Sequence, residues 1–314
     1  MKGCEPQGAG VPARWMTSRE PLNTRALMQG LGAHAFWGSM PLYLLLVHDV
    51  APLEYVAWRT LFTLPICLLA VAMFRNGAEL RAVLKDRRAV LTLMASAALI
   101  AVNWYGYVWA IQQEKIYAAS VGYYILPLVM MLFGMVFLGE RLNRVQWVAV
   151  VLAGAGVSAL AAGALTTLWL SLMLGVSFGM YGLLRKTVDA GALVGLTVES
   201  MLLVPVALGA LAWVDHGPGL SFGRDAVETA GILLGGPMTA IPLVMFALAA
   251  RALPYTVIGF LQFTSPTIVF LLGLFFFGEA LKPAQLACFV AIWVAAGLFT
   301  WDLVRGRRPG EAVA

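Results

Sequence analysis

The sequence predicts an all-α membrane protein in which ten transmembrane helices form two inverted repeats of five helices each. Three observations lead to this prediction: the composition, the number of long apolar segments and an internal repeat. Of the 314 residues, 61% are hydrophobic and only 12% are charged, and the mean hydropathy is +0.84. A soluble domain usually carries about 25% charged residues, so most of this chain must face something other than water.

Ten apolar segments are long enough to span a bilayer. A transmembrane helix needs roughly 20 mostly apolar residues, because the hydrocarbon layer is about 30 Å thick. Short connections that contain Gly, Pro or charged residues separate the segments. The predicted spans are residues 26–47, 55–74, 90–111, 117–138, 145–162, 165–184, 191–214, 227–250, 255–277 and 284–303.

The positions of Lys and Arg predict the orientation of these spans. Of the 21 basic residues, most fall in the chain ends or in loops on the same side as the ends. Basic residues concentrate in cytoplasmic loops, so both ends are expected in the cytoplasm. Residues 1–24, which lack the apolar core of a signal peptide, are expected to form a disordered cytoplasmic tail, and residues 305–314 a second tail. The basic residues in loops on the opposite side are Lys115, Arg224 and Lys282.

An internal repeat divides the membrane part into two halves, residues 25–163 and 164–304. A displacement of 139 residues aligns YYILPLVMMLFGMVFLGERLNRVQW with QFTSPTIVFLLGLFFFGEALKPAQL, and a displacement of 140 aligns Pro65 with Pro205. Each half contains five spans, and because five is odd the second half must insert upside down relative to the first. Inverted repeats are the recurring architecture of secondary transporters; an ancient duplication without a mechanical role is the alternative. The matched pairs include Pro127/Pro266, Gly134/Gly273, Gly139/Gly278, Glu140/Glu279 and Gln146/Gln285.

The repeated glutamates Glu140 and Glu279 follow glycines at the ends of two spans. A carboxylate near a helix N-terminus is stabilised by the helix dipole. We therefore expect these two glutamates to cap first turns of helices.

Other classes of function lack the motifs that their chemistry requires. No basic stripe follows the chain to an extent that could track a nucleic acid, so the net charge of +5 is read as a topology signal. The three cysteines lie too far apart for a disulfide framework or a metal site, and no cofactor is expected. The sequence has no P-loop or HExxH motif. An intramembrane enzyme and a non-transporting scaffold or receptor remain the alternatives to a transporter.

Seven short strings carry a family resemblance: HAFWGSMPLY, NWYGYVWA, ASVGYYILP, FLGERL, SFGMYGLLRK, GLTVES and GFLQFTSPT. Over about residues 23–303 the chain resembles the RarD proteins, in the EamA group of the drug/metabolite transporter superfamily. The resemblance implies a ten-helix bundle with a central cavity in a bacterial inner membrane. We therefore expect a secondary-active permease that moves a small, partly apolar organic solute by alternating access, in the direction of export. The expected partners are this solute, the lipid bilayer and protons as a candidate driving ion, without an obligate protein partner.

Two ionisable residues lie inside predicted spans, where charge is costly and marks a candidate functional site. Arg59 and Glu199 occupy equivalent repeat positions, which favours an ion pair between the halves. At about 1.5 Å per residue, Arg59 lies about 7 Å to the outer side of the membrane centre and Glu199 about 4–5 Å to the inner side. An extended side chain or a bridging water is needed to close this gap, and Arg59 has the alternative of reaching toward the outer interface. Glu199 is the candidate sensor of protons or of a cationic group on the solute.

Polar and aromatic residues of the third span suggest a cavity wall. Asn103 and Tyr107 are four residues apart and hence on one face of a helix, with Trp104 beside them. Aromatic side chains with one convergent amide suit a partly apolar solute. The alternative is hydrogen bonding between helices. Asn103 lies too deep for the aromatic belt at the membrane surface, so we expect it in the cavity wall.

Four further candidates come from the repeat, and a fifth comes from the first span. Tyr123 and Gln262 are equivalent, and each precedes its repeat's proline by four residues. Pro127 and Pro266 are expected to interrupt their helices and to free backbone carbonyls, as hinges or solute contacts; a static kink is the alternative. His34 either lines the cavity or is a core histidine with satisfied hydrogen bonds.

Overall fold

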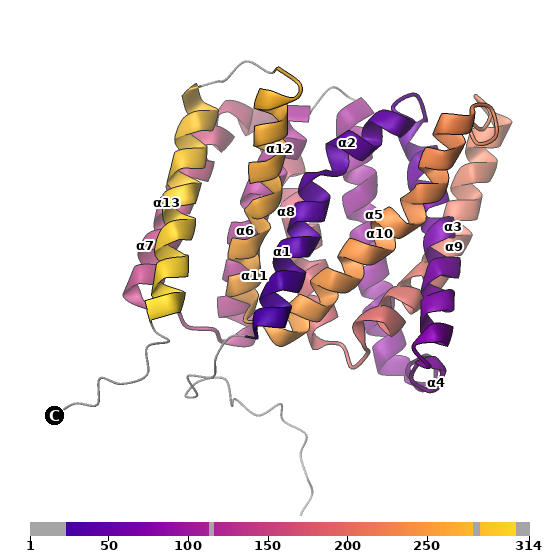
Figure 1. Cartoon of the computed structure of the whole chain (residues 1–314), viewed down its shortest axis with the longest axis horizontal. Helices are drawn as coiled ribbons and strands as arrows, with labels where there is room; N and C mark the ends of the chain where they lie inside the picture. Colours follow the sequence, from indigo (N-terminus) through magenta and orange to yellow (C-terminus); the bar gives the residue numbers. More distant parts are fainter. Residues whose placement is uncertain (1–22, 113–115, 279–282, 306–314) are drawn as a thin grey trace, which may run out of the picture.

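The protein is a bundle of α-helices, and the computed structural model describes residues 23–112, 116–278 and 283–305 (Figure 1). Within these residues, ten helical segments are long and apolar enough to cross a membrane, which confirms the predicted spans. The helices are α1 (Thr24–Gly38), α2 (Met40–Leu44), α3 (Pro52–Met73), α4 (Gly77–Lys85), α5 (Arg87–Gln112), α6 (Ile116–Leu138), α7 (Arg144–Ala161), α8 (Leu168–Thr187), α9 (Ala192–His216), α10 (Ala226–Ala252), α11 (Tyr255–Gln262), α12 (Thr264–Phe275) and α13 (Pro283–Arg305), with 3₁₀ turns at Leu45–Val47 and Ala162–Thr167.

Capping side chains fix several helix starts, because the first backbone N–H groups of a helix have no partner within it. Asn23 accepts a hydrogen bond from the backbone of Ala26 at the start of α1. Asn143 and Gln146 form a reciprocal capping box at the start of α7, and Asp225 accepts two backbone bonds at the start of α10. The predicted tails lie almost wholly outside the described residues, and Lys115, Glu279 and Lys282 lie outside them as well.

The helices differ from the prediction at four places. The first span breaks at Ser39 and the ninth breaks at Phe263, which ends α11 and precedes α12. Pro127 does not interrupt its helix, because α6 continues through it; the prediction of a break there is wrong. Pro266 lies in the first turn of α12, where a missing N–H is tolerated. The loop between the second and third spans contains the short helix α4, which the span prediction did not include.

Packing between helices follows the predicted repeat. The repeat makes each of the first five spans equivalent to the span five places later, and exchanging the two turns one helix pair into another. The pair α1–α10 becomes α8–α5, the pair α3–α10 becomes α9–α5, and the pair α1–α12 becomes α8–α6. All six pairs are in contact. The equivalent helices α3 and α9, α6 and α11, and α7 and α13 also pack against each other. The contacts between the halves therefore keep the pattern of a two-fold exchange, as two inverted repeats require.

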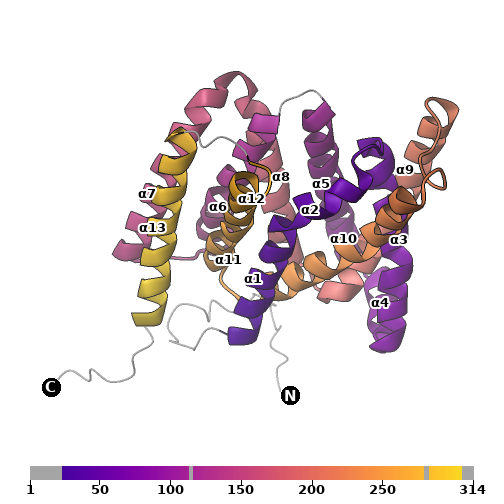
Figure 2. The same cartoon turned by 45° about the horizontal axis from the view of Figure 1, so that its top comes forward.

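Two faces of the bundle can be distinguished. The start of α1 and the end of α13 lie on the same face, together with α4 (Figure 1); we call it the terminal face. The pair α7–α13 forms one edge of the bundle, while α3 and α9 lie at the other edge (Figures 1 and 2). The helices between these edges, α1, α6, α8, α10 and α11, enclose the core.

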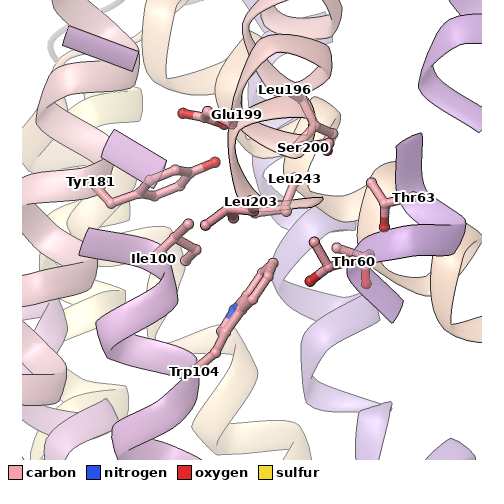
Figure 3. Close-up of a pocket in the computed structure, with 11 residues that line it drawn as sticks. Thr60, Thr63, Ile100, Trp104, Tyr181, Leu196, Glu199, Ser200, Leu203 and Leu243 are labelled. Atoms are coloured by element: carbon pink, nitrogen blue, oxygen red, sulfur yellow. The ribbon is translucent and has the colours of Figure 1, made fainter. Parts of the chain in front are cut away.

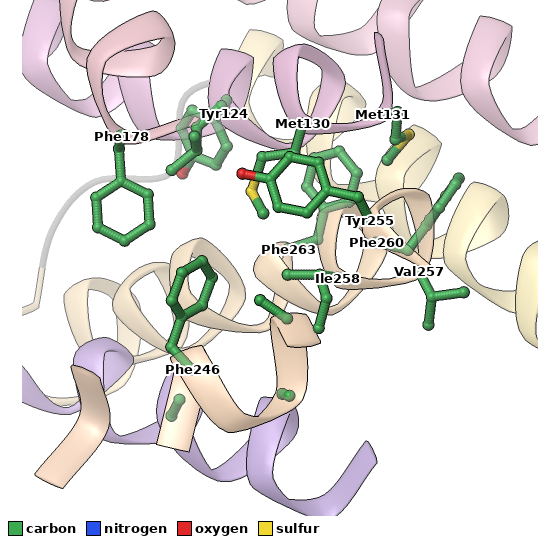
Figure 4. Packing of buried hydrophobic residues seen from close by; sticks show 14 of the residues in the cluster. Tyr124, Met130, Met131, Phe178, Phe246, Tyr255, Val257, Ile258, Phe260 and Phe263 are labelled. Carbon is green, nitrogen blue, oxygen red and sulfur yellow. The ribbon is translucent and has the colours of Figure 1, made fainter. Parts of the chain in front are cut away.

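The main hydrophobic core lies where the two halves meet. Aromatic residues of α8, α10 and α11 pack there against methionines of α6 (Figure 4). Phe178 and Phe246 have ring centroids 5.4 Å apart, and Tyr255 donates a hydrogen bond to the carbonyl of Gly179. Every described residue of α11 except Leu261 is buried. The core therefore packs α8, α10 and α11 of the second half against α6 of the first half.

Candidate functional site

Five helices from both halves surround a small pocket close to the predicted pathway residues. Its volume is about 10 Å³, which is on the order of one water molecule. Glu199 and Trp104 lie at opposite ends of it, with Tyr181 near Glu199 and Thr60 to one side (Figure 3). We call it the central pocket. Its lining residues are Thr60, Thr63, Ile100, Trp104, Tyr181, Leu196, Glu199, Ser200, Leu203, Thr239 and Leu243.

Glu199 is held by a buried polar network at one end of the central pocket. Ser96 of α5 donates a hydrogen bond of 2.5 Å to Oε1 of Glu199, and Nε of Arg185 lies 3.7 Å from the same oxygen. The exposed fractions of the Arg185 and Glu199 side chains are 1% and 2%. Oε2 of Glu199 has no hydrogen-bond partner among the described residues. The network joins α5, α8 and α9 through one carboxylate.

Arg185 lies just beyond the predicted sixth span, residues 165–184, yet the structure buries it near the end of α8. Its Nη2 donates a 2.7 Å hydrogen bond to the carbonyl of Ala192. Its guanidinium occupies the space beside Gly195, where a Cβ atom would overlap Nη1. Glu199 therefore has a neighbouring cation from its own repeat.

Arg59 belongs to a separate set of contacts, and the predicted ion pair with Glu199 does not form. Nε of Arg59 donates a 2.9 Å hydrogen bond to Oγ1 of Thr239. Its Cζ lies 4.3 Å from the ring centroid of Trp104 and 5.7 Å from that of Tyr55. Within the described chain, no carboxylate oxygen lies within 4.0 Å of its guanidinium. The physical reason is that the two residues lie at different depths in the membrane, Arg59 toward the outer side and Glu199 toward the inner side. Each side chain therefore contacts groups at its own depth.

Two pairs of tyrosines lie in the part of the bundle that contains Arg59. Tyr107 and Tyr123 form an edge-to-face pair with ring centroids 5.6 Å apart. Tyr43 and Tyr55 have ring centroids 6.3 Å apart, and the buried hydroxyl of Tyr55 has no partner among the described residues. Tyr123, predicted from the repeat, thus contacts Tyr107, predicted from the third span, as two residues of one cavity wall should.

His34 is fully buried, and neither of its ring nitrogens has a hydrogen-bond partner in the described part of the chain. Its ring lies 5.5 Å from that of Trp37 and 6.0 Å from that of Phe246, measured between centroids. Ser265 donates to the backbone carbonyl of His34 rather than to a carbonyl of its own helix. The contacts of the described residues therefore do not support the alternative of a core histidine with satisfied hydrogen bonds, and a place along the pathway stays a prediction.

The remaining candidates lie apart from the central pocket. Asn103 is buried and donates to the carbonyl of Leu174 and to the hydroxyl of Ser177, so its amide joins α5 to α8. These contacts favour the alternative of hydrogen bonding between helices over a place in the cavity wall. Gln262 is buried, and its Oε1 has no described partner. Neither residue lines the central pocket.

Polar side chains hold helix ends together at the terminal face. The Glu140 carboxylate accepts hydrogen bonds from the backbone N–H groups of Tyr255 and Thr256, in the first turn of α11. Lys186 donates to the carbonyls of Ala250 and Leu253 at the end of α10. Glu140 therefore caps a helix, as expected, but the helix belongs to the other repeat. Sequence reasoning missed this connection, because the repeat pattern does not say which first turn lies nearest.

An apolar groove opens beside the central pocket, between α3 and α9 on one side and α5 and α8 on the other. Its volume is about 560 Å³. Thr60, Trp104 and Leu203 line both the groove and the central pocket. Exposed residues such as Tyr105 and Val206 form part of its wall. The groove thus leads from the outside of the bundle to Trp104, against which the Arg59 guanidinium lies.

Comparison with known proteins shows consistent similarities. Residues 24–162 match the model of the EamA-like transporter family. The chain is 37% identical to an uncharacterized transporter of Pseudomonas aeruginosa, over 90% of this chain and 96% of the other. It is 37% identical to protein RarD of Streptomyces exfoliatus, over 91% of each chain, and 32% identical to protein RarD of Escherichia coli, over 90% and 96%. A solved structure titled "Crystal structure of protein" superposes with a TM-score of 0.71 at 17% identity, over 91% of this chain and 99% of the other, and it supports the fold.

Proposed function

Because the chain belongs to the EamA-like transporter family and matches a relative over 90% of its length, we propose that it is a secondary-active permease. In this proposal it moves a small, partly apolar organic solute across a bacterial inner membrane by alternating access, in the direction of export. Both termini are cytoplasmic, so the terminal face is the cytoplasmic face. Solute and bilayer are its partners, with protons as the driving ion.

The observation that carries the proposal is the exchange pattern of the helix contacts. When equivalent helices of the two halves are exchanged, contacting helix pairs become other contacting helix pairs. Two packings related by this exchange have similar energies and open toward opposite faces, which is the physical basis of alternating access in inverted repeats. The polar groups near the middle of the bundle support the same proposal, because charge within a span is costly unless it serves a pathway.

In this proposal the central pocket is part of a closed solute site. Its volume of about 10 Å³ is too small for an organic solute, so a solute enters only when the halves move apart. Glu199 is the proposed proton carrier, and Arg59, Trp104, Tyr107 and Tyr123 form the side of the pathway nearer the opposite face. His34, Asn103 and Gln262 are proposed to lie along this pathway and to change their side-chain contacts when the halves move. Pro127 and Pro266 are the proposed hinges of their helices.

Reconstitution into proteoliposomes tests the proposal. The purified chain is inserted into liposomes, a pH gradient is imposed, and a panel of metabolites and drugs is followed by mass spectrometry. We expect at least one solute to accumulate chemically unchanged, faster than in protein-free liposomes, and to lose this accumulation when the gradient is removed. Conversion of a solute would favour an intramembrane enzyme, and no movement of any solute would favour a scaffold or receptor.

A further inference from the structure

We propose that Arg59 binds the anionic group of the solute, so that the transported class is organic anions with an apolar body. This inference rests on the proposed transport function and adds the chemical class of its substrate. Of the two roles expected of Glu199, it keeps the proton sensor and sets aside the sensor of a cationic group on the solute.

Charge balance distinguishes the Glu199 site from the Arg59 site. Arg185 and Glu199 compensate each other, so a cationic group at Glu199 would have to displace a cation already present. The other buried carboxylate of the spans, Glu54, accepts hydrogen bonds from Trp58 and from the backbone of Ser221 and Phe222 at the outer end of α3. Arg59 has no carboxylate within 4.0 Å among the described residues. A cation at membrane depth normally pairs with an anion or reaches water, and an anionic solute would supply the missing charge.

The guanidinium of Arg59 is oriented for such a ligand. Thr239 holds its Nε, and Thr239 in turn donates to the carbonyl of Gly235, which fixes the hydroxyl. Trp104 lies against the guanidinium at 4.3 Å from the ring centroid. The described contacts leave the two terminal nitrogens without a hydrogen-bond acceptor. A planar guanidinium held at one nitrogen presents its remaining donors in the geometry that suits carboxylate, sulfonate or phosphate oxygens.

The space beside Arg59 explains why the rest of the solute is apolar. Trp104, which stacks on Arg59, also lines the apolar groove. The groove has a volume of about 560 Å³ and is lined almost wholly by apolar side chains. Ligand sites commonly combine a large apolar surface with a few oriented polar groups. A solute whose anion contacts Arg59 would lay its body along Trp104 toward this groove.

A matched pair of probes tests the inference on the purified full-length chain. The anion 2-naphthalenesulfonate and the neutral 2-naphthalenesulfonamide have the same apolar body and differ in charge. We expect the sulfonate to raise the midpoint of thermal unfolding at lower concentration than the sulfonamide. Arg59→Gln should weaken the sulfonate at least tenfold, whereas Arg59→Lys, which keeps the charge but loses the planar fork, should weaken it less. Arg224→Gln, in the loop before α10, is the control and should leave binding unchanged.

Two results would overturn the inference: equal binding of the two probes to the unaltered chain, or unchanged sulfonate binding by Arg59→Gln. If Arg59→Gln does not fold, competition on the unaltered chain replaces it. Benzoate should then displace the sulfonate and benzamide should not, and displacement by both or by neither contradicts the anion site.

Transport in proteoliposomes separates this inference from the proposed function. Arg59-dependent binding of the sulfonate without movement of any solute would support the anion site and contradict the permease. Movement of neutral or cationic solutes that does not depend on Arg59 would support the permease and contradict the anion site.

Discussion

Nε of Arg185 lies 3.7 Å from Oε1 of Glu199, and both side chains are almost completely excluded from solvent. The same carboxylate oxygen accepts a hydrogen bond from Ser96. One buried charge pair thus joins the last turns of α8, the first half of α9 and the first half of α5. Any movement that separates these helices has to separate the charges or neutralise the carboxylate, which couples the packing of the bundle to the charge state of Glu199.

Removal of Arg185 should destabilise the protein strongly. Arg185→Gln leaves the Glu199 carboxylate buried without its counter-ion, and breaking one side of a buried ion pair costs about 3–5 kcal/mol. We expect the free energy of unfolding, measured by denaturant titration in mixed micelles, to fall by about this amount. The double variant Arg185→Gln with Glu199→Gln should lose less than the sum of the two single changes, because it leaves no unpaired charge.

The control for this cycle is Arg251→Gln. Arg251 is also a basic residue near the terminal face, but among the described residues its partners are the carbonyls of Val188 and Ala190, and no carboxylate pairs with it. Its effect should therefore add to that of Glu199→Gln within about 0.5 kcal/mol. Additive behaviour of Arg185 and Glu199 would contradict the structural pair.

Gly195 should be required for the position of Arg185. A Cβ atom at Gly195 would overlap the Arg185 guanidinium, so Gly195→Ala should displace it and lower the stability in the same direction as Arg185→Gln. Gly209→Ala is a matched control on the same helix, because nothing lies within 4 Å of a Cβ atom there. Alanine is the better helix former, and Gly209→Ala should stabilise by roughly 0.5–1 kcal/mol. Equal effects of the two substitutions on unfolding would show that Arg185 does not occupy this space.

Glu199→Gln should remove the pH dependence of transport. The substitution keeps the side-chain shape and an oxygen that can accept the Ser96 hydrogen bond, but it removes the exchangeable charge. The expected result in proteoliposomes is a transport rate that no longer changes with external pH or with an imposed proton gradient. Glu228→Gln, in the first turn of α10, is the control and should keep the original pH profile. An unchanged profile for Glu199→Gln would exclude Glu199 as the proton carrier.

The two chain ends should be found on the cytoplasmic side. The start of α1 and the end of α13 share one face in the structure (Figure 1), and the basic residues indicate that this face is cytoplasmic. Fusion of a reporter that is active only in the cytoplasm to each end should give two active proteins. Activity at one end alone would contradict ten spans and the inverted halves together. Inactivity at both ends would contradict the orientation and leave the span count intact.

Sequence reasoning located the spans well because each one is a long apolar segment with charged or turn-forming ends. It could not assign partners to the charged residues. Arg185 and Lys186 are adjacent in the sequence, and a hydropathy argument treats both as cytoplasmic. On a helix, however, neighbouring side chains point about 100° apart. Arg185 consequently turns inward to Glu199, whereas Lys186 caps the end of α10.

The helix breaks show a second limit of sequence reasoning. Proline suggested interruptions at two equivalent positions, but α6 continues through Pro127 and the first span breaks at Ser39. A proline in a helix leaves one backbone acceptor free, and tertiary packing decides whether the helix bends or breaks. At Phe263, both the backbone N–H and the hydroxyl of Thr267 donate to the carbonyl, a contact that no periodic pattern reveals.

Loss of Glu140 should favour opening of the terminal face. Its carboxylate caps α11 from the other repeat, through the N–H groups of Tyr255 and Thr256. Hydrogen bonds to a charged group contribute about 1.5–3 kcal/mol, so Glu140→Ala should shift the balance between the two open forms by about tenfold or more. A cysteine introduced at the buried position Ala250 reports on this face. Cys4 is replaced first, whereas the native Cys67 and Cys288 can stay because they are buried.

The labelling rate of Ala250→Cys by a membrane-impermeant maleimide, added from the terminal face, should rise about tenfold in the Glu140→Ala background. Glu140→Gln keeps one acceptor oxygen and should give an intermediate rate. A second reporter, Ala110→Cys in the last turns of α5, is buried toward the opposite face and should be labelled more slowly from that face. This opposite response distinguishes alternating access from loss of structure. If both reporters become more reactive, Glu140 stabilises the fold as a whole and does not bias one open form against the other.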